Sequence, residues 1–210
     1  MWLLPRLFVL CSLLLGAVVA VSDELSSASL RGVLVARWEQ QQVSNQTITS
    51  SFEVIDDTFV RDSNPSRNYN DVTNLNVAFG PIYNERITFL KFPIDADALP
   101  NNNISHSTAI SSAIIRMRVN SVSPGNNTLN FFLCDSLTWN ESVITWNNRP
   151  TYNNVTVDPI VTRTVTPIDL QTWLEFDVTT AVISAVQASQ SVLSLVIEPE
   201  RPVDVIDSTI

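Results

Sequence analysis

Apolar and polar residues alternate along most of this chain from residue 52 onward. In the segment 113–119, apolar side chains occupy nearly every second position, and Arg116 and Arg118 stand between them. A period of two places successive side chains on opposite faces of a strand, so one face packs on a core while the other meets water. This pattern favours an all-β protein with antiparallel sheets, each wet on one side.

The predicted strands are separated by segments rich in Asn, Ser, Pro and Asp, which are typical of turns. A short helix is expected before the last strand, beginning at Thr179 or Thr180, because apolar residues from 181 to 186 recur at helical spacing. Short strands, turns and one short helix describe an antiparallel β-sandwich. The strands are predicted over residues 52–60, 75–79, 86–94, 113–119, 129–133, 155–165, 173–178 and 191–197.

The first twenty residues have the features of a secretory signal peptide. Arg6 precedes an apolar run over residues 7–19, which ends in small residues suited to cleavage. That run is short for a transmembrane anchor, the alternative that it must be weighed against. We therefore expect residues 1–20 to be removed and the mature protein to be secreted to the extracellular space.

Residues 21–51 form a Ser- and Gln-rich lead-in whose order the sequence leaves open. Its one apolar patch, residues 30–38, fits either a short helix or a strand. The β-sandwich domain is expected to cover residues 52–210.

The mature chain is acidic. Loss of the signal peptide removes Arg6 and no acidic residue, which leaves 11 basic and 21 acidic side chains and a formal charge of −10. An acidic surface repels nucleic acid and anionic lipid, so neither is an expected partner. Residues 178–197 carry no charge, but eight of these twenty are Thr, Ser or Gln, so we expect no membrane span in the mature chain.

Cysteines and glycosylation sequons also bear on secretion. Cys11 leaves with the signal peptide, so Cys134 has no partner within the mature chain, and it is either a buried small side chain or an intermolecular bridge. Asn-X-Ser/Thr sequons predict exposed loops in a eukaryotic secretory pathway. They occur at Asn45, Asn103, Asn126, Asn140 and Asn154.

Few residues suit catalysis, so we expect no enzyme. His106 is the only histidine and lies in an Asn-rich loop, where a solvated side chain is the simpler interpretation than a general base. Oxygen ligands do cluster in one loop and its flanks, where they are candidates for a structural calcium ion, although their spacing matches no EF-hand. These candidates are Asp56, Asp57, Asp62, Asn64 and Asp71.

Aromatic rings are the chemistry that suits a sugar, because a pyranose packs its apolar face on an exposed ring while polar neighbours bind its hydroxyls. For each tryptophan a structural role at the edge of a sandwich is the competing interpretation. Tyrosines in loops are better candidates for exposure. The predicted ligand-binding residues are Tyr69, Tyr83, Arg67, Arg86 and Trp173.

Several short phrases occur in a fixed order. The most specific runs from Trp139 to Pro150 and contains Trp-x-Glu followed by Thr-Trp-Asn-x-x-Pro. Its members are Trp139, Glu141, Thr145, Trp146, Asn147 and Pro150. The others are Ser63-Asn-Pro-Ser-Arg-Asn-Tyr69, Leu75-Asn-Val77, Leu90-Lys-Phe92, Ala113-Ile-Ile-Arg-Met117 and Phe176-Asp-Val-Thr179.

In this order the phrases resemble the DNRLRE domain, a group also classed as carbohydrate-binding module family 96. The resemblance covers roughly residues 52 to 198. It implies a jelly-roll-like antiparallel β-sandwich that binds polysaccharide and has no catalytic activity of its own. It also implies that the tryptophan phrase identifies the fold, with Trp139 and Trp146 bracing it, while recognition lies in the loops around it.

Two features depart from the family pattern. Only Glu200–Ile206 stands where a closing strand is usual, so the last strand is expected to be short or missing. Some relatives bind acidic polymers such as alginate, whereas a charge of −10 disfavours a polyanion unless basic side chains converge locally. The side chains in question are Arg61, Arg67, Arg86 and Lys91.

The leading hypothesis is a secreted, non-catalytic module that binds a polysaccharide or glycan. The alternative is an extracellular structural or adhesive β-sandwich that acts through protein contacts.

Overall fold

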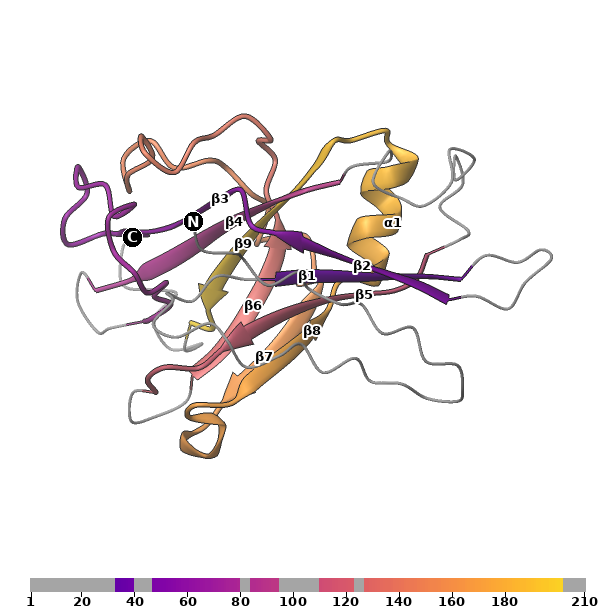
Figure 1. Cartoon of the computed structure of the whole chain (residues 1–210). Helices are drawn as coiled ribbons and strands as arrows, with labels where there is room; N and C mark the ends of the chain where they lie inside the picture. The colour runs from indigo at the N-terminus through magenta and orange to yellow at the C-terminus, as the bar shows by residue number, and fades with distance from the viewer. Residues whose placement is uncertain (1–32, 40–46, 80–83, 95–109, 123–126, 202–210) are drawn as a thin grey trace, which may run out of the picture.

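The computed structural model describes residues 33–39, 47–79, 84–94, 110–122 and 127–201 (Figure 1). Several residues named above lie outside this part of the chain. They are the signal peptide 1–20, Tyr83, His106 and the sequon residues Asn45, Asn103 and Asn126.

Two antiparallel sheets make up the described chain (Figure 1). The four-stranded sheet has the order β2 (Thr47–Glu53), β1 (Val33–Glu39), β5 (Ile110–Arg118) and β8 (Trp173–Asp177). The five-stranded sheet has the order β3 (Asp56–Arg61), β4 (Arg86–Pro93), β9 (Val192–Pro199), β6 (Asn127–Leu133) and β7 (Val161–Val165). The prediction of an antiparallel β-sandwich with one short helix is confirmed.

The main core fills the space between the two sheets. Alternate residues of the strands point into it, including Phe92 of β4, Ile115 of β5 and Phe176 of β8. Phe131 of β6 packs its ring 4.5 Å from that of Phe176, a contact that joins the two sheets near β8. Burial of these large side chains is the principal stabilising term of the sandwich.

The lead-in that the sequence left undefined contributes two strands. β1 pairs with β2 on one side and with β5 on the other. The apolar patch at 30–38 is therefore a strand over its described part. β2 begins before residue 52 and crosses the boundary expected between lead-in and domain.

Three strand predictions need correction. The run 52–60 is divided, because Glu53 ends β2 in one sheet and Asp56 begins β3 in the other. The run 75–79 contains only an isolated bridge between Ala78 and Arg86. Of the run 155–165 only β7 is a strand; Val155 is 89% exposed, so alternation there does not reflect burial.

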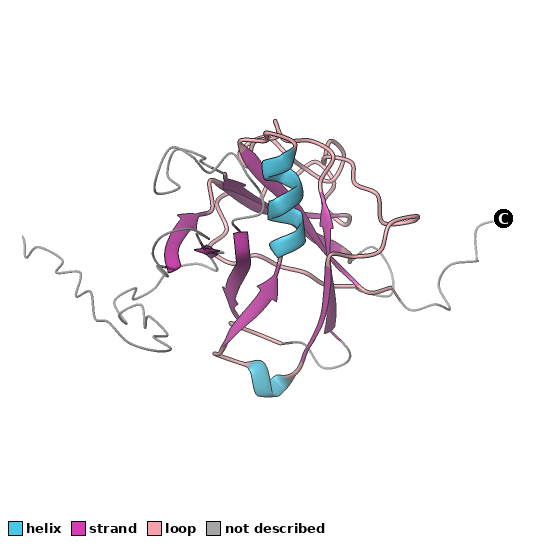
Figure 2. Ribbon diagram, turned by 90° about the vertical axis from the view of Figure 1, so that its right-hand side faces the viewer, coloured by secondary structure: helices cyan, strands magenta, loops and turns pink. Residues whose placement is uncertain are grey.

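The helix α1 (Thr179–Gln187) packs against β5 and β9 (Figure 2). The N-cap residue of the helix is Val178, not a threonine as predicted. The carboxylate of Asp177 accepts the backbone N–H of Thr179 at 2.9 Å. The hydroxyl of Thr179 in turn accepts the backbone N–H of Ala113 at 2.9 Å. The Phe-Asp-Val-Thr phrase thus fastens the start of the helix to β5. None of the described helices has the length and apolar character to cross a bilayer.

The last described strand, β9, has eight residues and pairs on both sides, with β4 and β6. Most of Glu200–Ile206, the segment taken as a remnant of a closing strand, lies outside the described residues.

Phe176→Ala is expected to lower the free energy of unfolding by about 3–5 kcal/mol, because it empties a fully packed site between the sheets. Trp173→Ala, on the same strand but half exposed, is expected to change it far less. Urea unfolding of the two variants and the parent measures both effects. Equal losses would contradict this assignment of the core.

Candidate functional site

A buried ion pair lies beside Trp139, the first residue of the tryptophan phrase. The ammonium of Lys91, on β4, is 2.7 Å from the carboxylate of Asp56, on β3, and both side chains are largely shielded from water. Lys91 also donates to the backbone carbonyl of Trp139 and lies 4.5 Å from the centre of its ring. A buried charge is tolerated only when it is paired and hydrogen-bonded, which these contacts achieve.

Glu141 closes the free edge of the five-stranded sheet. Its carboxylate accepts the backbone N–H of Asp57 at 2.8 Å, a donor of the edge strand β3. Its own N–H donates to the other carboxylate oxygen of Asp56 at 3.0 Å. An edge strand otherwise exposes unpaired backbone groups, so Glu141 protects β3 in the way that a neighbouring strand would.

The side chains of Trp139 and Asn68 also hold the loop from 139 to 150 in place. The indole N–H of Trp139 donates to the hydroxyl of Ser194 on β9 at 2.8 Å. The side-chain amide of Asn68 donates to the carbonyls of Glu141 and Ile144 at 2.6 and 2.7 Å. The loop thereby covers the outer face of the five-stranded sheet, where it encloses a second apolar cluster that includes Phe89 and Val196.

The remaining members of the phrase stabilise the loop itself. Thr145 donates its hydroxyl to the side chain of Asn148 at 2.7 Å. Asn147 donates its backbone N–H to the carbonyl of Pro65 at 3.0 Å. Trp146 is half-buried beneath the guanidinium of Arg149, whose central carbon lies 4.0 Å from the ring centre.

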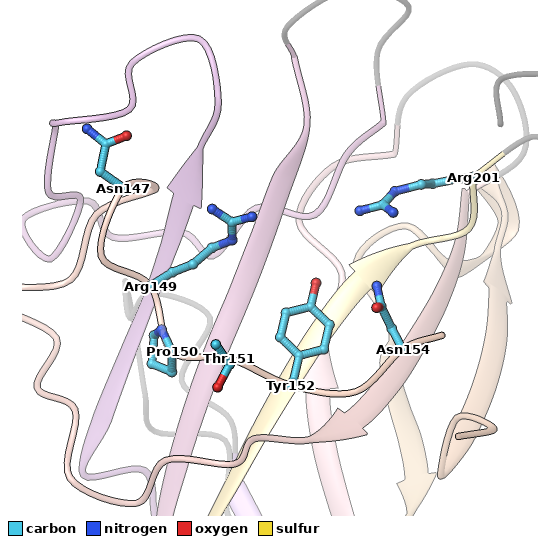
Figure 3. Close-up of a pocket in the computed structure, with 7 residues that line it drawn as sticks. All are labelled: Asn147, Arg149, Pro150, Thr151, Tyr152, Asn154 and Arg201. Carbon is cyan, nitrogen blue, oxygen red and sulfur yellow. The ribbon is translucent and has the colours of Figure 1, made fainter. Parts of the chain in front are cut away.

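An open pocket of about 390 Å³ lies beside this loop. Figure 3 shows Tyr152 and Asn154 directing their polar groups toward the side on which Arg201 lies. Both donate to the buried carboxylate of Glu198, the tyrosine hydroxyl at 2.7 Å and the amide at 2.8 Å. The pocket is lined by Asn147, Arg149, Pro150, Thr151, Tyr152, Asn154 and Arg201.

The charges of the pocket are balanced within the protein. Arg201 bonds to Glu85 at 2.8 Å and lies 4.0 Å from Glu198. Burial alone would lower the pKa of Arg201, but the bond to Glu85 and the nearby carboxylates raise it overall. Burial, and then the bond to Glu198, raise the pKa of Tyr152 well above its ordinary value. Much of this polar surface is therefore already committed to protein partners.

Three arginines gather around Tyr69; we name Arg61, Arg67 and Arg86 the arginine cluster. Arg61 and Arg86 stand opposite each other in the β3–β4 register. The guanidinium of Arg67 lies 4.7 Å from the centre of the Tyr69 ring. Burial, and then the charge of Arg61, lower the pKa of Arg86.

The arginine cluster is poorly neutralised by the protein. Within the described part of the chain no carboxylate lies at ion-pair distance from any of its three members. The Nε atoms of Arg61 and Arg86 are shielded from water and have no hydrogen-bond partner among these residues. Asn84, which accepts from Arg86 at 3.2 Å, supplies only a neutral oxygen. Such uncompensated groups are costly in a folded protein.

The expected exposure of Tyr69 is wrong. Its side chain is only 6% exposed, and its ring stacks on Phe59 with 4.4 Å between centroids. The loop rich in polar residues folds back on β3, so the ring is shielded. Tyr69 positions Arg67 instead of offering its own face to a ligand.

The four predicted ligand-binding residues that the structure describes do not form one surface, and Tyr83 lies outside the described residues. Arg67, Arg86 and Tyr69 come together at the arginine cluster, whereas Trp173 lies on the four-stranded sheet and is 50% exposed. Lys91, the fourth basic side chain considered, is buried with Asp56. Sequence reasoning did not foresee the direct pairing of Arg61 with Arg86, because strand register is set by contacts far apart in the chain.

At least three of the five candidate calcium ligands have side-chain contacts within the protein. Asp56 binds Lys91, Asp62 accepts the N–H of Glu85 at 3.0 Å, and Asn64 donates to the hydroxyl of Tyr69 at 3.3 Å. Asp71 is exposed. Within the described residues no group of three or more His, Cys, Asp or Glu side chains is arranged to hold a metal ion. Calcium binding stays a prediction.

The two described sequons differ in environment. Asn140 is exposed, and its side-chain oxygen accepts the backbone N–H of Ser142 at 2.9 Å. Asn154 is half-buried and donates to Glu198. Attachment of a glycan to either stays a prediction.

Cys134 is 5% exposed and free, and its thiol donates to the carbonyl of Thr151 at 3.7 Å. Burial raises the pKa of this thiol. A buried thiol of this kind fits the first of the two interpretations, a small packed side chain.

Comparison with known proteins gives a family. A family model described as carbohydrate-binding module family 96 matches residues 48–207. The match spans the edge strand β3, the arginine cluster and the tryptophan phrase. No curated protein is similar enough in sequence to count as a match.

Glu141→Ala is expected to lower the free energy of unfolding by about 1–3 kcal/mol, because it leaves the N–H of Asp57 without an acceptor. Glu200→Ala, which removes an exposed carboxylate, is the control and is expected to stay within about 0.5 kcal/mol of the parent. Chemical denaturation compares the three proteins. An unaltered Glu141→Ala variant would contradict the role of Glu141 at the edge.

Tyr152→Phe is expected to reduce the fall in the free energy of unfolding as pH rises above about 10. The pKa of Tyr152 is raised in the folded state, whereas an unfolded tyrosine titrates near pH 10. Above about pH 10 the unfolded chain therefore loses a proton that the folded chain retains, so stability falls as pH rises. Unfolding midpoints of parent and variant from about pH 8 to 11 test this, and identical slopes would refute it.

Proposed function

This chain belongs to carbohydrate-binding module family 96, and we propose that it is a secreted, non-catalytic domain. We propose further that it binds acidic polysaccharide through the arginine cluster. Secretion is supported by the signal-peptide features of residues 1–20 and by the sequons. A non-catalytic role is supported by the use of Asp56 and Glu141 in hydrogen bonds that hold the fold together.

An acidic ligand is proposed because the guanidinium groups of the arginine cluster lack a paired carboxylate among the described residues. Arg61 and Arg86 face each other in the β3–β4 register, and no carboxylate of the described residues lies at ion-pair distance from either. Burial, and then the charge of Arg61, lower the pKa of Arg86, and the opposing effect of Asp62 does not cancel this. A carboxylate brought by a ligand would supply the missing counter-charge.

The geometry suits a uronate better than a neutral sugar. A guanidinium presents a planar fork of donors that matches the two oxygens of a carboxylate. Arg61 and Arg86 lie on neighbouring strands, whose positions the sheet holds, and Arg67 is steadied against the Tyr69 ring. Preorganised donors of this kind lose little conformational entropy when the ligand binds.

The acidity of the chain as a whole does not oppose this. The Debye length at physiological salt is about 8 Å, so distant carboxylates are largely screened at the cluster. Asp62, whose charge acts on Arg86, also accepts a backbone N–H from Glu85. Local charge, not the total of −10, governs the encounter with an acidic polymer.

Polygalacturonate and its methyl-esterified form test the proposal, because they share a backbone and differ in free carboxylates. We expect the parent to bind the acid form more tightly, and Arg86→Gln to lower that affinity by about tenfold or more. Arg86→Lys is expected to recover it only in part, since the fork is lost. Isothermal titration calorimetry measures each affinity.

Arg163→Gln provides the matched control. Arg163 is exposed on β7 and pairs with Asp169 at 3.5 Å, away from the cluster, so its removal should leave binding unchanged. Arg86→Gln removes like-charge repulsion and should not lower the melting temperature. Equal affinity for both polymers, or parental binding by Arg86→Gln, would show that the cluster is not the site.

A further inference from the structure

Trp173 differs in its exposure from Trp139 and Trp146. Trp139 is buried at 6% exposure and Trp146 lies beneath Arg149, whereas Trp173 is 50% exposed on the outer face of β8. Its neighbours along the strand, Leu174 and Phe176, point into the core. An exposed indole on a strand offers a flat apolar face on which a sugar ring can pack.

The surroundings of Trp173 are polar and set by strand register. Arg118 stands opposite Trp173, and Arg116 stands opposite Glu175, in the β5–β8 ladder. Arg116 lies 3.3 Å from the Glu175 carboxylate, and its guanidinium is 5.6 Å from the centre of the indole. Arg116 and Glu175 therefore form an ion pair beside the ring, while Arg118 donates to the neutral side-chain oxygen of Gln171.

Next to the ring, the backbone is strained. Gln171 has a φ of 62°, in the left-handed region that a non-glycine residue rarely adopts. Its backbone N–H donates to the carbonyl of Val119 at 2.7 Å, and its side-chain amide donates to the carbonyl of Asn120 at 3.2 Å. Its side-chain oxygen accepts from Arg118 at 2.8 Å. Gln171 is thus held in one conformation at the rim of the exposed indole.

We propose that this face is a second sugar-binding surface, specific for an uncharged polysaccharide. Its residues are Arg116, Arg118, Asn120, Gln171, Trp173 and Glu175. The indole takes the apolar face of a pyranose ring, and the fixed amide, guanidinium and carboxylate groups bind the hydroxyls around it. The exposed carboxylate of Glu175, which has no counterpart in the arginine cluster, repels an acidic chain and fits a neutral one.

The two surfaces are separate. The Trp173 face belongs to β5 and β8 of the four-stranded sheet, whereas the arginine cluster belongs to β3, β4 and the following loop of the other sheet. The inference rests on the proposed function in taking the ligand to be a polysaccharide, but not on the arginine cluster. A domain with two such surfaces joins neutral and acidic polymers, and gains avidity where both are present in one matrix.

Affinity electrophoresis of the purified full chain in gels that contain hydroxyethylcellulose, xyloglucan or galactomannan tests the inference. We expect retardation by at least one of the three, and a loss of affinity of about tenfold or more in Trp173→Ala. Arg86→Gln should be retarded like the parent. Failure of the arginine site would instead appear only in the polygalacturonate measurement, so the two proposals fail separately.

Gln171→Gly distinguishes a binding role from a structural one. Glycine relieves the positive φ, so the melting temperature should stay level or rise, while affinity for the neutral polymer falls because the fixed amide is gone. Trp173→Ala should also keep its melting temperature close to that of the parent. No retardation of the parent by any of the three polymers, or parental retardation of folded Trp173→Ala, would overturn the proposal.

Discussion

The contact between Lys91 and Asp56 is the interaction on which the rest of the structure depends. It joins β3 to β4 and, through the carbonyl and ring of Trp139, fixes the start of the loop that covers the five-stranded sheet. A buried ammonium without these partners would be strongly destabilising. The pair therefore makes the edge strand, its neighbour and the loop mutually dependent.

The residues of the tryptophan phrase are engaged in contacts that stabilise the fold. Trp139 bonds Ser194, Glu141 closes the edge of β3, and Asn147 meets the loop that follows β3. None of these groups is free to adapt to a ligand without loosening the sheet. The arginine cluster and the Trp173 face, which we propose as the recognition surfaces, are separate from this phrase.

These two surfaces offer different chemistry. Among the described residues the arginines of the cluster form no ion pair, whereas Trp173 has an apolar ring among charges of both signs. Both carry a local cost in the free protein: an unpaired guanidinium in one and a strained Gln171 in the other. Costs of this kind are retained where a ligand or a required geometry offsets them.

Much of the fold was readable from local pattern. The run 173–178 is β8, whose alternate residues are buried, and the strand predicted over 86–94 is β4, which is buried on both faces because the loop 139–150 covers its outer side. The division of 52–60 between two sheets was not readable, since both halves keep the same period. The burial of Tyr69 was missed for a similar reason: its polar loop suggested exposure, and only Phe59 on β3 shields it.

By itself the sequence determined the class of fold, the position of most strands and the family, because these depend on periodicity and on residues close together in the chain. Tertiary structure decided which faces are covered. Asp57 meets Glu141, and Arg61 meets Arg86, only because strands and loops far apart in sequence are brought into register. Long-range packing of this kind leaves no periodic pattern in the sequence, so the proposed sugar-binding surfaces are defined only in the folded chain.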